Sequence, residues 1–380
     1  MSTDSTPSRS HSIDGHCDQR FAPVRQAFER SFEQQDEVGA AVCIYHGGQK
    51  VVDLTGGWRD AQRTQRWTPD TVLNIWSSTK GVAASCFAML VDRALADYDR
   101  PVAHWWPEFG VCGKERITLA MLLSHQAGLC GFTSPATIDD LLGGEAAAAR
   151  LVAQEPLWTP GSASGYHAIS AGILATALFR RIEGRSLRQF VADELALGRG
   201  LDMSIGLPAA QAHRAATMIA PPAMRSSQIG SYSRAQTAAL ANPPLDPLLP
   251  NSPRWREADL PSANGHSNAR ALATLYASIV ATDRPLVGAK ALAQATQLRI
   301  DNVDLVLGVP SRWAAGFLLN TEGCFGPTPE AFGHSGWGGS LAFADPRAGL
   351  SFAYVMNRMG TTLRGDPRNT ALIEAAYACL

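Results

Sequence analysis

Ser77 and Lys80 stand three residues apart before an apolar stretch, and this S-x-x-K spacing is the feature of the chain most able to do chemistry. Residues three apart are neighbours on one helix face. A serine attacks a carbonyl only when a base removes its proton, and a lysine is a base only when its amine is neutral. Burial favours the neutral amine, and residues 82–91 are apolar nearly throughout. The pattern therefore predicts a serine nucleophile activated by Lys80, with Ser78 as a rival that faces elsewhere on the helix.

Two later segments could complete such a site. Tyr166 follows a Pro-Gly turn and opens an apolar run, residues 166–182. A phenol held near a lysine ammonium would have a lowered pKa and could relay a proton; the alternative is an aromatic residue that caps a helix. Residues 332–340 read F-G-H-S-G-W-G-G-S. Their glycines would let a ligand reach backbone N–H groups, and the alternative is a tight turn between strands.

These three segments, in this order, resemble the serine hydrolases of the β-lactamase and penicillin-binding-protein superfamily, most of all the family VIII carboxylesterases. The resemblance covers about residues 15–380. It implies that Ser77 is acylated and that Lys80 and Tyr166 share the role of the base. A stretch between the first two motifs, residues 122–129, is also similar.

The same resemblance assigns the rest of the pocket to the glycine-rich segment. It implies that the backbone N–H groups of Ser77 and Trp337 form the oxyanion hole. It also implies that His334, Ser335 and Gly336 stand where the family has an H-x-G or K-T-G strand. We expect His334 and Ser335 to orient the substrate and to hydrogen-bond the tyrosine.

Two departures from the β-lactamase pattern favour a neutral ester as substrate. Ala168 stands where β-lactamases of this type carry the asparagine of Y-x-N, which binds a substrate amide. His334 stands where they carry a lysine that attracts a carboxylate, and a histidine is mostly neutral near pH 7.

Secondary-structure patterns predict an α/β plus α fold of the β-lactamase type. Two β-rich runs, residues 40–45 and 50–54, flank a Gly-Gly turn, and strand patterns return near the C-terminus. We expect one antiparallel sheet built from both termini, flanked by helices, with a helical lobe inserted. The later strands are expected at residues 313–319, 340–344 and 350–356, and the helices at 21–32, 81–95, 118–125, 138–153, 166–182, 186–195, 268–281 and 369–379.

These patterns also set the expected boundaries. Residues 1–15 are predicted to be a disordered tail, and residues 16–380 a single hydrolase domain. Within it, the α/β lobe is expected at about 16–75 and 285–380, and the helical lobe at about 76–284. Residues 221–261, rich in proline, serine and asparagine, are expected to form long surface loops.

Composition argues against several other functions. With a net charge of −1 and a pI of about 6.8, the protein has no strong positive electrostatic field that would attract nucleic acid or an anionic membrane. The longest apolar stretches are too short to cross a bilayer. The first fifteen residues lack the apolar core of a signal peptide, and the seven cysteines are scattered, so a cytoplasmic protein is expected.

Other catalytic chemistries are not supported by motifs. The nine histidines show no H-E-x-x-H or similar ligand spacing, and no G-x-x-x-x-G-K loop is present, so we expect no metal and no cofactor. An α/β-hydrolase elbow, G-x-S-x-G, would need glycine at Trp337 and a histidine after its serine and acid, but every histidine lies at or before His334.

The sequence thus predicts a serine carboxylesterase that acts on small, short-chain esters through an acyl-enzyme on Ser77. Four alternatives on the same fold stay open: a β-lactamase, a D-amino-acid peptidase or amidase, an acyltransferase, and a binding module without turnover. Reaction with a fluorophosphonate separates the last of these from the enzymes. The oligomeric state is not readable from the sequence.

Overall fold

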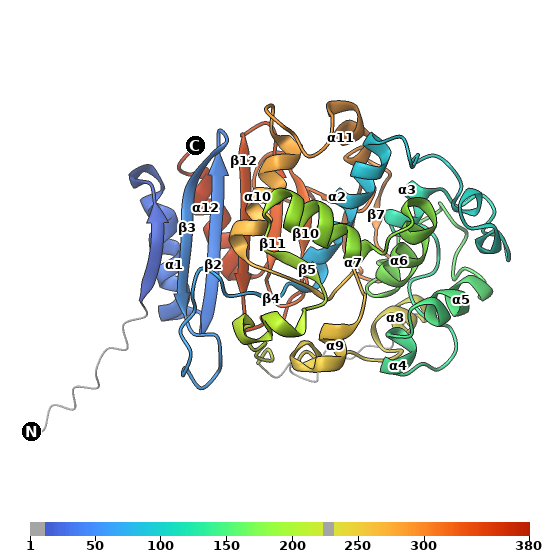
Figure 1. Cartoon of the computed structure of the whole chain (residues 1–380), viewed down its shortest axis with the longest axis horizontal. Coiled ribbons are helices and arrows are strands. Elements are labelled where there is room, and N and C mark those ends of the chain that lie inside the picture. Colours follow the sequence, from blue (N-terminus) through green and yellow to red (C-terminus); the bar gives the residue numbers. More distant parts are fainter. Residues whose placement is uncertain (1–11, 223–231) are drawn as a thin grey trace, which may run out of the picture.

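The largest sheet of the molecule joins the two ends of the chain. The structure is a computed structural model that describes residues 12–222 and 232–380 (Figure 1). Its nine-stranded sheet is antiparallel throughout. In spatial order the strands are β1 (Ile13–Cys17), β3 (Gln49–Gly57), β2 (Gly39–His46), β12 (Leu350–Met356), β11 (Leu341–Asp345), β10 (Phe332–Ser335), β9 (Leu318–Leu319), β8 (Pro310–Trp313) and β7 (Ile300–Val303). Because β2 pairs with β12, the predicted sheet built from both termini is confirmed.

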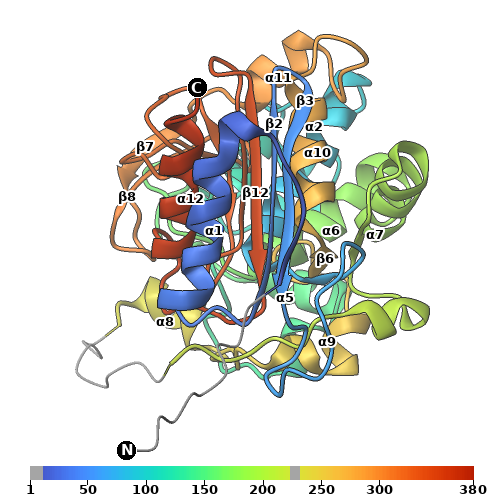
Figure 2. The same ribbon diagram turned by 90° about the vertical axis from the view of Figure 1, so that its left-hand side faces the viewer.

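Helices cover both faces of this sheet. Helices α1 (Ala22–Gln34) and α12 (Pro367–Tyr377) pack together on one face (Figure 2). Helix α10 (Ala269–Val280) lies on the other face, against β2, β11 and β12. Every residue of β12 is buried, as expected for a strand that is covered on both faces. This burial explains why its sequence is almost continuously apolar.

The helical lobe lies at the end of the sheet that contains β7, and α2 packs against β10 (Figure 1). Its central helix is α2 (Thr79–Asp92), in which residues 79–90 are all buried. The helix is therefore apolar nearly all round, as its sequence predicted. The other helices of this part of the chain are α3 (Leu119–Leu123), α4 (Ile138–Leu141), α5 (Glu145–Ala153), α6 (Ser170–Glu183), α7 (Leu187–Phe190), the π-helical segment Val191–Leu197, α8 (Arg234–Leu240), α9 (Pro253–Glu257) and α11 (Ala289–Ala295).

A second, three-stranded sheet was not predicted from the sequence. It consists of β4 (Leu73–Asn74), β6 (Gly265–Ser267) and β5 (Met203–Ile205). These strands are only two or three residues long, too short for a periodic pattern to reveal. Strand β4 ends just before the S-x-x-K segment, so this small sheet anchors the chain where the site begins.

The predicted boundaries need two corrections. The tail prediction was wrong for residues 13–15, because these residues belong to β1 and pair with β3; residues 1–11 lie outside the described residues. The assignment of residues 76–284 to the helical lobe was wrong for α10, which packs on the large sheet. The apolar face of α10 shows that it is buried, but it does not show what buries it.

Predicted elements also differ in detail. The single helix expected at residues 138–153 is broken into α4 and α5, and Gly144 between them has a φ of +56°. The loop expected at residues 221–261 contains α8 and α9, each capped by a serine side chain; residues 223–231 fall outside the described part of the chain. None of the helices in the described residues is long and apolar enough to span a membrane.

Candidate active site

Ser77 lies at a sharp bend in front of α2. Trp76 has a φ of +46°, a left-handed conformation that is strained for a bulky side chain. Residues Trp76–Ser78 form a short 3-10 turn that leads into the helix. Ser77 is only partly buried, whereas Ser78 is buried and its hydroxyl lies 3.2 Å from the Ser340 hydroxyl. The bend therefore presents Ser77, and not Ser78, to the site.

The Lys80 amine is buried beside the Ser77 hydroxyl. Its Nζ lies 3.2 Å from Ser77 Oγ, and it donates to the carbonyl oxygens of Ala168 (2.7 Å) and Ser262 (2.9 Å). Burial lowers the pKa of Lys80 well below its usual value of 10.5. No carboxylate forms an ion pair with Lys80 among the described residues. The amine is therefore set up to be neutral, as the apolar residues 82–91 predicted.

Tyr166 completes a cluster with these two residues. Its side chain is hydrogen-bonded with Ser77, and Lys80 Nζ lies 4.7 Å from the centre of its ring. The ring stacks on Trp313, with a centroid distance of 5.7 Å and an interplanar angle of 10°. The structure thus brings together the three residues that the sequence singled out from separate segments.

The predicted direction of the Tyr166 pKa was wrong. Burial raises this pKa above its usual value of 10, and the hydrogen bond with Ser77 offsets the increase only in part. The expectation of a lowered pKa required a charged lysine beside the phenol. Because Lys80 is itself depleted of its proton, it supplies little positive charge to stabilise a phenolate. Tyr166 is therefore a protonated phenol at neutral pH.

Asp304 holds the tyrosine segment in place, and sequence reasoning missed it. Its buried carboxylate accepts hydrogen bonds from the backbone N–H of Tyr166 (2.9 Å) and from Ser164 Oγ (2.9 Å). It also accepts hydrogen bonds from the backbone N–H groups of Val306 and Leu307, which follow it in the same turn. Helix α6 begins only at Ser170, so Tyr166 lies before the helix and is positioned by Asp304. No motif surrounds Asp304, and its 138-residue separation from Tyr166 hides the contact in the sequence.

The glycine-rich segment provides β10 and the turn after it. His334 is buried, and its Nδ1 lies 2.7 Å from the carbonyl oxygen of Ser335. Burial lowers the pKa of His334 to about 3, so this histidine is neutral at physiological pH. Ser335 Oγ donates to the carbonyl oxygen of Leu363 (3.2 Å).

The expected hydrogen bonds from His334 and Ser335 to Tyr166 are not present. The Tyr166 and His334 rings are 6.2 Å apart at their centroids, and within the described residues His334 Nε2 is buried without a partner. His334 Nδ1 and Ser335 Oγ each bond a backbone carbonyl instead. The resemblance between motifs matches residue types, and it does not determine which atoms His334 and Ser335 bond.

Residues 336–340 form a tight turn beside the Ser77 segment, here named the 336–340 turn. The backbone N–H of Gly339 donates to the carbonyl oxygen of Gly336 (3.2 Å), and Gly338 has the positive φ, +88°, that the third residue of a type II turn requires. Trp337 occupies the second position of this turn. Within the described ranges its N–H has no acceptor, so it is available to a ligand.

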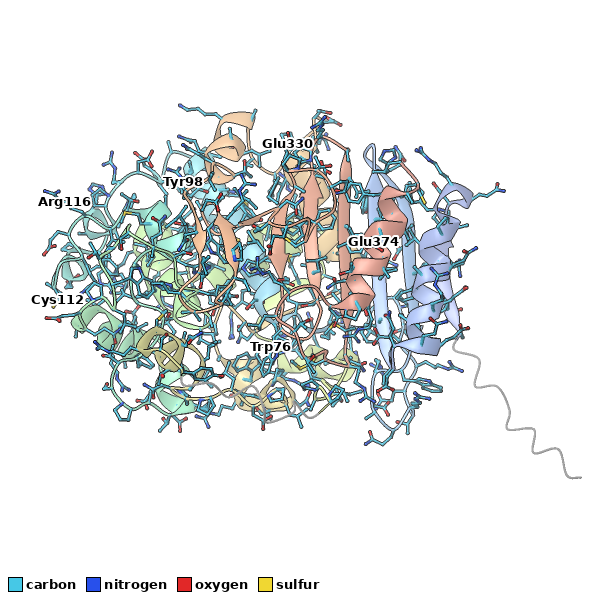
Figure 3. All side chains as sticks on the ribbon, turned by 180° about the vertical axis from the view of Figure 1, so that it is seen from behind. Trp76, Tyr98, Cys112, Arg116, Glu330 and Glu374 are labelled. Carbon is cyan, nitrogen blue, oxygen red and sulfur yellow. The ribbon has the colours of Figure 1, made fainter. Side chains whose placement is uncertain are left out.

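This turn lies directly against the segment that carries the nucleophile. A Cβ added at Gly336 would be 2.4 Å from the carbonyl oxygen of Ile75 and 3.2 Å from Ser78 Oγ. The Trp337 and Trp76 rings are 5.0 Å apart at their centroids. In Figure 3, Trp76 is labelled between α12 and the helical lobe. The turn that carries the free N–H of Trp337 therefore packs against the segment that contains Ser77.

In the described part of the chain, no group of three or more histidine, cysteine, aspartate or glutamate side chains could hold a metal ion. The chemistry that the arrangement offers is that of a serine, a neutral amine, a phenol and a free backbone N–H. Such a set can attack a carbonyl and stabilise the oxyanion that forms.

Comparisons with known proteins agree with this fold and site. The beta-lactamase family profile matches residues 24–377, and the chain belongs to this family of serine hydrolases. It is 32% identical, over 94% of its length and 86% of the relative, to the esterase/beta-lactamase LipL of Mycobacterium tuberculosis.

Two solved structures are more similar still. A family VIII carboxylesterase is 43% identical, with a TM-score of 0.92, over 97% of this chain and all of the other. A penicillin-binding protein homologue from Caulobacter crescentus has the same identity, coverage and TM-score. The predicted resemblance to family VIII carboxylesterases is confirmed, and ester hydrolysis is supported at the level of the family.

Proposed function

We propose that the protein is a serine carboxylesterase that hydrolyses short-chain esters through an acyl-enzyme on Ser77. The observation that carries this proposal is the environment of Lys80. A neutral amine has two N–H groups and one lone pair, and two backbone carbonyls already accept hydrogen bonds from Nζ at 2.7 and 2.9 Å. The lone pair is then directed to Ser77 Oγ, 3.2 Å away. Lys80 is thus oriented to accept the serine proton.

The proposed reaction has two steps. In the first, Lys80 takes the proton of Ser77 as its oxygen bonds to the ester carbonyl carbon, and the N–H groups of Ser77 and Trp337 bind the oxyanion. The ester C–O bond then breaks, and the alcohol leaves with a proton relayed through Tyr166. In the second step, Lys80 takes a proton from water as the water attacks the acyl-enzyme. The acid leaves, and the proton returns to Ser77.

Bulky aromatic rings near Ser77 support a preference for short acyl groups. Trp76 packs against Trp337 and Trp255, with centroid distances of 5.0 and 5.4 Å. These rings fill space beside the nucleophile, and they are apolar. His334 and Ser335 are proposed to orient the substrate, together with Gly336, at the end of β10. A neutral His334 favours an uncharged ester over a carboxylate.

A substrate screen tests this proposal. The purified protein is given p-nitrophenyl esters from acetate to palmitate, together with one chromogenic cephalosporin. We expect kcat/KM to be highest for acetate to butyrate and to fall for octanoate and longer chains, with much slower cleavage of the cephalosporin. Faster cleavage of the cephalosporin than of any ester would contradict the proposal and favour a β-lactamase. Added methanol, with both products counted, separates hydrolysis from acyl transfer.

The cysteines support a reducing compartment as the place where the protein acts. All seven are free thiols, and four of them, Cys43, Cys86, Cys130 and Cys379, are buried. Proteins of oxidising compartments more often pair their cysteines. We therefore propose a cytoplasmic location, which fractionation of the source cells with an antibody to the protein would test.

A further inference from the structure

The 336–340 turn is held from behind by the start of α12. Two of its carbonyl groups face this helix: Arg368 Nη2 donates to the Gly338 oxygen (3.0 Å), and Asn369 Nδ2 donates to the Gly339 oxygen (2.9 Å). All of these contacts are buried. A Cβ at Gly339 would come within 2.9 Å of the Asp366 carboxylate, so the turn and the helix start are in close contact. The peptide groups that follow Gly338 and Gly339 are thus fixed by two side chains of one helix.

A buried ion cluster fixes Arg368 in turn. Its guanidinium bonds both oxygens of Asp366 (2.9 and 2.8 Å) and both oxygens of Glu37 (3.3 and 3.2 Å). The exposed fractions of Arg368, Asp366 and Glu37 are 4%, 3% and 0%. Glu37 precedes β2, so the cluster joins α12, the chain after α1 and the 336–340 turn.

Such a cluster is not explained by stability alone. Burying ions costs free energy that their attraction often fails to offset, and apolar replacements can be neutral or stabilising. What the cluster does supply is a fixed direction for the five N–H groups of an arginine. Here one nitrogen of the guanidinium, Nη2, points at the turn that carries the free Trp337 N–H.

Ser340, the last residue of the turn, is held from the side of the nucleophile. Ser340 Oγ donates to the Ile75 carbonyl oxygen (2.8 Å) and lies 3.2 Å from Ser78 Oγ. Two independent sets of bonds therefore hold the part of the turn that follows Trp337. One set ties the turn to the segment of Ser77, and the other ties it to α12.

We propose that Arg368 and Asn369 are positioning residues that set the direction of the Trp337 N–H toward the oxyanion. This inference rests on the proposed function, because it assigns the Trp337 N–H to the oxyanion hole. Neither residue touches the substrate. Their effect is on the transition state, since a donor placed about 1 Å away from its proper position can cost 10²-fold in rate.

The Asn369→Ala and Asn369→Asp variants test this role. Each removes the N–H that holds the Gly339 carbonyl, and the aspartate keeps the size of the side chain. We expect kcat for p-nitrophenyl acetate to fall roughly 10- to 100-fold, less than the 10²- to 10³-fold loss when an oxyanion donor is removed outright. KM should change less than threefold. The inhibition constant of phenylboronic acid, whose tetrahedral adduct on Ser77 places an oxygen in the oxyanion hole, should rise by a factor similar to the loss in kcat.

Asn320→Ala is the matched control. Asn320 is also a buried amide that donates to two backbone carbonyls, those of Gly326 and Thr328, both at 2.8 Å, but it lies outside the 336–340 turn. We expect this variant to lose thermal stability while kcat and the boronate inhibition constant stay within twofold of wild type. An equal loss of kcat in Asn320→Ala and Asn369→Ala would show a merely structural effect and overturn the proposal.

Arg368→Lys is a second test that keeps the buried positive charge. Lysine can still pair with Glu37 and Asp366, but it lacks the planar fork that reaches Gly338. As for the Asn369 variants, we expect Arg368→Lys to lower kcat with little change in KM. Unchanged kcat and boronate binding in folded Asn369→Ala and Arg368→Lys would overturn the positioning role alone. Turnover that survives in Ser77→Ala would instead overturn the proposed function and this role with it.

Discussion

In the part of the chain that the structure describes, Lys80 is surrounded by carbonyl groups and not by carboxylates, and the proposed chemistry depends on this difference. A carboxylate beside the amine would stabilise its charged form and raise its pKa. The carbonyl oxygens of Ala168 and Ser262 orient Nζ without supplying a full negative charge. Burial then lowers the pKa of the amine. The same residue is thus positioned and neutral.

Tyr166→Phe tests the proton relay. The variant keeps the ring that stacks on Trp313 but removes the hydroxyl that is hydrogen-bonded with Ser77. We expect kcat for p-nitrophenyl acetate to fall by about 10²- to 10⁴-fold, the usual contribution of a positioned acid or base. A loss of less than tenfold would remove Tyr166 from the reaction. Tyr276→Phe, which changes a buried tyrosine whose hydroxyl has no partner in the described residues, is the control.

The pH dependence of kcat/KM tests the state of Lys80. The active form has a neutral amine, so activity is lost as the pH falls through the lowered pKa of Lys80 and is constant above it. We expect a plateau that starts well below pH 10. No second limb should come from His334, whose pKa is lowered to about 3 by burial. Activity that keeps rising up to pH 10 would show an ordinary lysine and contradict the account.

Single residues divide into those that local sequence could identify and those that it could not. Ser77 and Lys80 are three residues apart on one helical turn, so their contact could be predicted from the local sequence. The direction of the Tyr166 pKa depends on burial by distant segments, and the sequence led to the wrong sign. Asp304 and Asn369 act through contacts between segments far apart in the chain, and no local motif marks them.

At the scale of elements, the long and strongly patterned segments were predicted well. The sequence placed α2 and the β2–β3 hairpin nearly correctly, because their apolar patterns are long and the Gly47-Gly48 turn is distinctive. Short strands such as β4, β5 and β7 form because a neighbouring strand is already in place. Their sequences alone favour no structure strongly, so they were missed.

Asn268→Ala tests the start of α10, a helix that packs against both α2 and the large sheet. Asn268 caps α10, and its Oδ1 accepts from the Ala271 N–H at 2.8 Å. Loss of the cap should lower the free energy of unfolding by about 1 kcal/mol, within a usual range of about 0.5–2 kcal/mol. Urea denaturation followed by circular dichroism measures this change. Glu374→Ala, on the exposed side of α12, should change it by less than about 0.5 kcal/mol; an equal effect of both variants would contradict the capping role.

At the scale of the whole molecule, the site lies where the sheet and the helical lobe meet. The nucleophile and Lys80 come from the start of α2, Tyr166 from the segment before α6, and the 336–340 turn from the end of β10. The chain therefore has to form the sheet from both of its ends before the site is complete. This arrangement explains why the site residues are spread over some 260 positions although they lie side by side.

Mass spectrometry of the protein after reaction with a fluorophosphonate identifies the nucleophile. We expect one covalent adduct per chain, found in the peptide that contains Ser77, and no adduct and no ester hydrolysis in Ser77→Ala. Prior addition of excess p-nitrophenyl acetate should slow the labelling, because the acetyl group occupies the same oxygen. An adduct on another residue, or unchanged labelling and turnover in Ser77→Ala, would contradict the account.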